Sequence, residues 1–169
     1  DGAGNLSSAA STATSAVELL DDTAPVLGSI DVFGEFTSTQ VTGRVAGDVF
    51  IAGDTLTYTA TIDETTSLQD IENMAVKLTL RKNTVLTLLR PDGATDTDMV
   101  FSADYVVAEG DTDDDDLGVK SYTLENISDI SGNAADASVA LGEITQTFDG
   151  VIDSDTIAVD ANAPAAKVL

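Results

Sequence analysis

Alternating apolar and polar positions dominate the chain from about residue 26 onward. In residues 55–62, Leu56, Tyr58, Ala60 and Ile62 alternate with threonines. Successive side chains of a strand point to opposite faces of its sheet, so this pattern is typical of a strand with one buried and one wet face. The alternation therefore predicts an exposed sheet that buries a single face.

Six further runs are rich in β-branched and aromatic residues and are bounded by Gly, Asp, Asn or Pro. They are residues 26–33, 74–80, 84–89, 99–107, 119–127 and 137–148. Tyr122, Leu124 and Ile127 keep the alternation only after a slip of one residue, so we expect a β-bulge near Glu125. Together the runs predict an all-β fold, a two-sheet antiparallel β-sandwich with almost no helix.

A pair of turn signals occurs twice along the chain. Asp1-Gly2-Ala3-Gly4-Asn5 leads to Asp22-Thr23-Ala24-Pro25, and residues 129–133 (Asp-Ile-Ser-Gly-Asn) lead to residues 160–164 (Asp-Ala-Asn-Ala-Pro). Each pair joins a tight Asp-x-x-Gly-Asn turn, a strand rich in small residues, and a junction whose proline interrupts the strand ladder. A repeated order of this kind indicates module boundaries.

Four segments resemble, in the same order, the Ig-like repeats of large bacterial and archaeal adhesins and surface-layer proteins. Residues 53–59 look like the second-strand signature of that family, and residues 105–113 like the strand and turn before its penultimate strand. Residues 129–133 look like the turn before its last strand, and residues 159–164 like its interdomain junction. The chain departs from the family pattern in a long central part and in an acidic insert.

The resemblance implies an Ig-like sandwich over residues 22–164 with extended terminal segments. Residues 1–21 then form the final strand of a preceding module or a donor strand for a neighbour. Residues 165–169 form the start of a following module or a C-terminal strand. The partners implied are neighbouring Ig-like modules or identical subunits.

Charge and composition narrow the function. Seven basic residues against thirty acidic ones give a net charge of −23, which argues against nucleic acid as a partner. No run of about 18 apolar residues occurs, so we expect no direct insertion into a membrane. The chain contains no His and no Cys, which removes the usual general base near neutral pH and the thiol nucleophile. The lack of these groups predicts a protein that is not an enzyme. A compact chain of this charge needs a salty medium or bound metal ions, which predicts that it is secreted or displayed on the cell surface.

Clustered carboxylates make Ca²⁺ the candidate cofactor, because this ion takes six to eight oxygen ligands. One candidate site is the acidic turn at residues 109–116, for which the alternative interpretation is a solvated loop that binds no ion. The second is a module junction, where Asp21 with Asp22, or Asp160 with Asn162, meets the turn that begins at Asp129. The candidate ligands of the acidic turn are Glu109, Asp111, Asp113, Asp114, Asp115 and Asp116.

Two sequons provide candidate glycosylation sites, at Asn5 and at Asn126.

Three functions remain open from the sequence. The first is a structural module of a surface-layer protein or adhesin, acting as a spacer or lattice tile. The second is a secreted filament or tube subunit that assembles by β-strand donation. The third is a carbohydrate-binding accessory module with a cell-surface glycan as partner, which the absence of Trp disfavours.

Overall fold

A computed structural model describes most of the predicted sandwich. The described residues are 21–44, 49–64, 67–69, 73–90, 99–112, 117–135, 145–148 and 159–162. The strands are β1 (Val26–Glu35), β2 (Thr55–Asp63), β3 (Ala75–Leu80), β4 (Val85–Leu88), β5 (Val100–Val106), β6 (Val119–Glu125) and β7 (Thr145–Phe148). Each falls inside or within two residues of a run predicted from the sequence.

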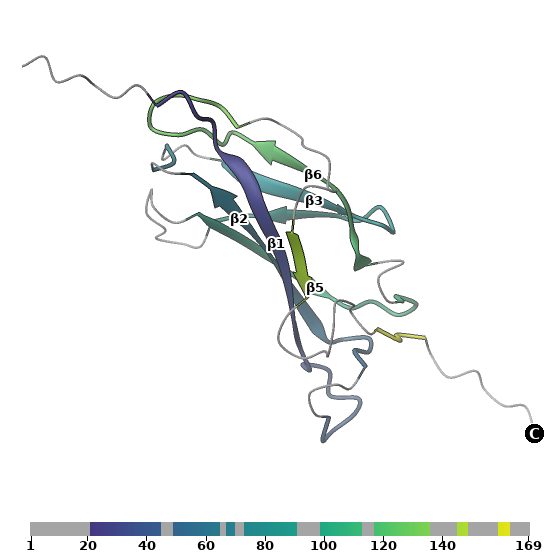
Figure 1. Cartoon of the computed structure of the whole chain (residues 1–169). Coiled ribbons are helices and arrows are strands. Elements are labelled where there is room, and N and C mark those ends of the chain that lie inside the picture. The colour runs from purple at the N-terminus through teal and green to yellow at the C-terminus, as the bar shows by residue number, and fades with distance from the viewer. Residues whose placement is uncertain are drawn as a thin grey trace, which may run out of the picture.

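The strands form two sheets, one with the order β5-β2-β1-β7 and one with the order β4-β3-β6. Figure 1 shows β1 crossing in front of the sheet that contains β3 and β6. Leu89 and Ser102 exchange two backbone hydrogen bonds, of 3.1 and 2.9 Å, and so connect the two sheets along one side. The all-β, two-layer prediction is therefore confirmed for the described residues.

Two details differ from the predictions. The strands are antiparallel except that β7 runs parallel to β1, with Ser29 opposite Thr145. The expected bulge near Glu125 is also absent, because β6 pairs with β3 in register there and simply ends. Asn126 adopts a left-handed φ of 55°, which redirects the chain and lets Ile127 reach the core. The register shift between β3 and β6 lies instead between Thr79 and Leu80.

The inner faces of the two sheets carry the core. On β2, Leu56, Tyr58, Ala60 and Ile62 are at most 1% exposed, which confirms the alternation in the sequence. From the facing sheet, Val76, Leu78 and Leu80 of β3 are 0% exposed. The Tyr58 hydroxyl donates a 2.8 Å hydrogen bond to the carbonyl of Leu117, so the one polar atom of that buried side chain is satisfied. Each large side chain buried in this way stabilises the fold by about 1.5–3 kcal/mol.

The sandwich has two ends, which we name from the direction of the chain. The entry end contains Asp21, just before β1, and Glu64, just after β2. The exit end contains Asp54, just before β2, and the segment 159–162. Because a strand rises about 3.3 Å per residue, the nine residues of β2 separate the two ends by about 30 Å.

Candidate functional site

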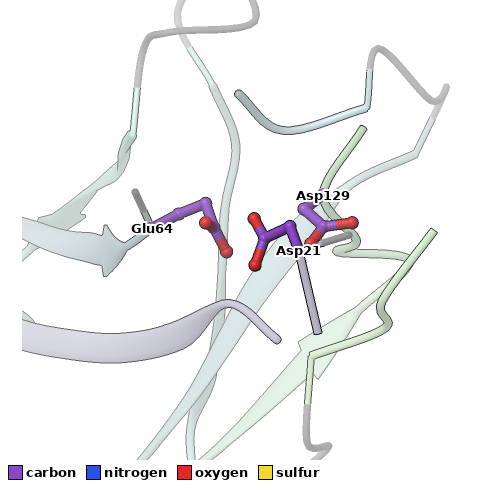
Figure 2. Close-up of side chains that lie close together, drawn as sticks. All are labelled: Asp21, Glu64 and Asp129. Carbon is purple, nitrogen blue, oxygen red and sulfur yellow. The ribbon is translucent and has the colours of Figure 1, made fainter. Parts of the chain in front are cut away.

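Three carboxylates converge at the entry end. Asp21, Glu64 and Asp129 each offer one carboxylate oxygen, and these oxygens all lie within 4.8 Å of one another. Figure 2 shows the carboxyl groups of Asp21 and Glu64 facing each other, with Asp129 beside Asp21. Two oxygens up to about 4.8 Å apart can share one Ca²⁺, because each lies about 2.3–2.6 Å from the bound ion. The spacing therefore fits a divalent cation.

The turn predicted at residues 129–133 places Asp129. Its carboxylate accepts hydrogen bonds from the backbone amide of Asn133 at 2.8 Å and from the Asn133 Nδ2 at 2.7 Å. Gly132 takes a φ of 92°, a left-handed conformation that glycine adopts without strain. Asp129 is fully buried, and burial alone would raise its pKa. The hydrogen bonds outweigh burial and hold the pKa of Asp129 below its usual value, so the carboxyl group is charged at neutral pH.

Asn133 also ties the entering chain to this turn. Its Nδ2 donates a 2.7 Å hydrogen bond to the backbone carbonyl of Asp21. The Asp21 carboxylate accepts a 3.0 Å hydrogen bond from the Thr23 amide through Oδ1, while its buried Oδ2 has no hydrogen-bond partner. Among the described residues, no Lys or Arg lies within ion-pair distance of Asp21 or Asp129. The carboxylates of Asp21 and Asp129 therefore lie close together without a basic partner among the described residues.

The exit end also buries an aspartate, but pairs it with arginine. Asp54 is fully buried, and its two oxygens receive both terminal nitrogens of Arg44. The backbone amides of Ser38 and Ile51 add hydrogen bonds of 2.8 Å each. Burial alone would raise the pKa of Asp54, but these hydrogen bonds and the charge of Arg44 outweigh it and lower the pKa. The guanidinium lies 4.5 Å from the centre of the Phe36 ring, which adds a cation–π contact.

A second pair at the exit end involves Asp111, which the sequence makes a candidate calcium ligand. The Lys82 Nζ lies 2.6 Å from its Oδ1, and its Oδ2 accepts hydrogen bonds from the Tyr105 hydroxyl at 2.6 Å and the Ala108 amide at 2.8 Å. Burial opposes both charges, yet the hydrogen bonds between them lower the pKa of Asp111 and raise that of Lys82. Both carboxylate oxygens of Asp111 are therefore already occupied by donors in this chain.

The segment 159–162 docks at the exit end through isolated β-bridges to Phe50 and Thr112. Asp160 donates its amide to the Phe50 carbonyl at 2.9 Å, and Ala161 donates its amide to the Asp111 carbonyl at 3.1 Å. Val159 and Ala161 are buried, at 2% and 4% exposed. Consequently Asp160 and Asn162 do not meet the turn at 129–133 within this chain, because about 30 Å of sandwich separates them from it. Of the two junction pairs, only Asp21 reaches that turn.

The remaining predicted residues are scattered. Asp22 is exposed and lies outside the carboxylate cluster, although its neighbour belongs to it. Glu109 is exposed at the exit end. Asn126 is exposed, and its Nδ2 donates a 3.1 Å hydrogen bond to the carbonyl of Asn73. Asp113, Asp114, Asp115, Asp116 and Asn5 lie outside the described residues.

Sequence reasoning did not identify Glu64 or Arg44 as parts of either end. Glu64 follows β2 directly and comes beside Asp21 because β1 and β2 are antiparallel, with Val26 opposite Asp63. That pairing was a usable signal, since the residue before β1 and the residue after β2 must then share one end. Arg44 lies in the long connection between β1 and β2, where no periodic pattern predicts its position.

Comparison of the chain with protein-family models, curated proteins and solved structures finds no match. Within the described ranges, no helix has the length and apolar character needed to span a membrane.

Proposed function

We propose that this chain is a non-catalytic structural module of an extracellular or cell-surface protein, with an Ig-like sandwich that acts as a spacer between neighbouring modules. The observation that carries the proposal is the placement of the two junctions. Asp21 is tied to the turn at 129–133, and Ala161 is tied to the loop of Asp111, about 30 Å away at the opposite end. A module held at opposite ends extends a row of modules in one direction.

Both junctions are held by contacts with the sandwich, which suits a spacer more than a flexible linker. At the entry end one asparagine side chain holds the incoming backbone. At the exit end two buried side chains, Val159 and Ala161, anchor the outgoing backbone. Such contacts limit the angles at which the chain can enter and leave.

The proposal includes Ca²⁺ at the entry end, held by Asp21, Glu64 and Asp129. The chemistry of the donors supports it, since carboxylate oxygens are the ligands that this hard cation prefers. The bound ion would neutralise the clustered charge and add a link between the incoming chain and the turn. Extracellular modules commonly bind calcium at about 10⁻⁴ to 10⁻³ M, so the site suits a protein outside the cell.

Small-angle X-ray scattering tests the spacer role. We expect two copies joined head to tail to be longer than one copy by about 30–40 Å, because each sandwich adds its strand length and its end loops. Labelling of intact source cells with an antibody against residues 22–162 tests the location in parallel. A tandem pair scarcely longer than one copy would contradict a spacer, and labelling only after permeabilisation would contradict surface display.

A further inference from the structure

A cleft at the exit end has a composition that the spacer role does not explain. It has a volume of about 460 Å³ and lies between the loop that follows β1 and the segment 159–162. Its lining residues are Gln40, Val41, Ile51, Ala52, Glu109, Asp160, Ala161 and Asn162. Four of these side chains are aliphatic, and two are carboxylates.

The two carboxylates of the cleft lack a basic partner. Glu109 forms no hydrogen bond or ion pair with another described residue, and Asp160 accepts hydrogen bonds only from Asn162, at 3.2 and 3.1 Å. Two basic side chains of the same end are already engaged, since Arg44 pairs with Asp54 and Lys82 pairs with Asp111. The cleft therefore presents uncompensated negative charge beside an apolar surface.

The apolar surface is accessible to a partner. Val41 is 49% exposed and lines the same cleft as the two carboxylates, so apolar surface and negative charge lie side by side there. A ligand that covers Val41 and places a positive charge near Glu109 and Asp160 would bury the apolar surface and neutralise the carboxylates together. Lysine has this form, because its four-carbon stem packs on apolar surface while the ammonium group stays at the edge.

We propose that this cleft binds a lysine side chain presented by a neighbouring polypeptide. The aliphatic stem lies against Val41 and Ala52, and the ammonium group pairs with Glu109 and Asp160. The inference goes beyond the proposed function, because the same chemistry binds the same group whether or not the module stands in a row. Because Asp160 and Asn162 belong to the exit segment, the cleft exists only while that segment is docked.

Isothermal titration of the full chain with a short peptide tests this proposal. The probe is acetylated and amidated Ala-Val-Lys-Val-Ala, compared with the same peptide carrying ε-acetyl-lysine. We expect Glu109→Gln and Asp160→Asn each to weaken binding by about 1.4- to fivefold, since exposed ion pairs contribute about 0.2–1 kcal/mol. Val41→Ser should weaken binding of the lysine peptide as well, and the acetylated peptide should bind more weakly to the unaltered chain.

Glu35→Gln is the matched control, because it removes one exposed charge near the same end without altering the cleft. If Glu35→Gln weakens binding as much as Asp160→Asn, the peptide is attracted only by the net charge of −23 and the proposal is wrong. Equal binding of the two peptides would also overturn it, as would displacement of the lysine peptide by a neutral oligosaccharide. Failure here leaves the scattering result for the spacer role unaffected.

Discussion

The two ends of the sandwich treat buried carboxylates differently. At the exit end, Asp54 and Asp111 each face a basic side chain of the same chain, Arg44 and Lys82. At the entry end, Asp129 is just as buried, but its carboxylate accepts hydrogen bonds from Asn133 and lies within 4.8 Å of two further carboxylates. The exit end therefore pairs both buried aspartates with basic side chains, whereas Asp129 at the entry end is held by hydrogen bonds.

Because of this difference, we expect the stability of the two ends to depend differently on the ions in solution. A buried ion pair forms with the fold and responds little to the salt around it, because the surrounding protein excludes screening ions. A carboxylate cluster gains from any cation that binds the folded form, and its stability then depends on the concentration of that cation. We therefore expect the stability of the exit end to change little with salt or cation concentration, and that of the entry end to rise when a cation binds.

Removing the arginine at the exit end should have the largest effect. Arg44→Met leaves the fully buried Asp54 without its cation, and breaking a buried pair in this way costs about 3–5 kcal/mol. Urea unfolding followed by circular dichroism measures the loss. Without Arg44 the pKa of folded Asp54 should rise above its unfolded value, so the deficit of the variant should shrink as the pH falls.

The double variant Arg44→Met with Asp54→Asn separates charge from packing. It removes the stranded carboxylate, so it should recover much of the stability lost in Arg44→Met. Lys120→Met serves as the matched control, because Lys120 is exposed and donates only to the Asn83 side chain, at 3.0 Å. A loss below 1 kcal/mol in Arg44→Met would show that the pair does not stabilise the exit end.

Calcium should stabilise the chain by the next largest amount, and through the entry end. An ion that binds only the folded form adds RT ln(1 + [L]/Kd), which is about 2.7 kcal/mol at a hundred times Kd. For a domain of this size, 1 kcal/mol shifts Tm by about 2–4 °C, so calorimetry should show a rise of about 5–10 °C over chelator-treated protein. Sodium chloride at matched ionic strength should reproduce only a small part of that rise.

Neighbouring aspartates allow a close control for this effect. Asp21→Asn should abolish most of the calcium response, whereas Asp22→Asn removes the same charge one residue away, outside the cluster, and should preserve it. Changing Asp113, Asp114 and Asp115 to Asn tests the acidic turn separately. A calcium response that survives in Asp21→Asn but disappears in the triple variant would place the ion at the acidic turn instead.

The sequence predicts the sandwich well because strand periodicity is a local property. Leu56 and Ile62 indicate a buried face without any knowledge of the partner strands, and the structure confirms it. The parallel pairing of β7 with β1 is a property of the whole topology, which no local pattern contains. The bulge prediction was wrong because Asn126 ends its strand through a left-handed φ, which also explains the slip in alternation.

The candidate site was predictable only in part, for the same reason. The turn at 129–133 is marked by its own sequence, and of the pair Asp21 and Asp22 only Asp21 lies beside it in the structure. Asp111 illustrates the limit, since its partner Lys82 lies 29 positions earlier in the chain. A run of acidic residues cannot reveal which of its members a distant lysine neutralises.

The smallest effect we predict concerns the tether at the entry end. Asn133→Ala removes the hydrogen bonds from Nδ2 to the Asp129 carboxylate and to the Asp21 carbonyl, both 2.7 Å, and should cost about 1–2 kcal/mol. Hydrogen exchange should rise in residues 21–24 and 128–135 while the exit end stays protected, because the change lies about 30 Å away from it.

Asn162→Ala is the matched control, since its exposed Nδ2 bonds only to Asp160 at 3.1 Å and its loss should cost less than about 0.5 kcal/mol. If calcium bridges Asp21 and Asp129, it should restore part of the lost protection in Asn133→Ala, because the ion replaces the missing link. Unchanged exchange in residues 21–24 would mean that the Asn133 side chain does not hold the incoming chain at the entry end.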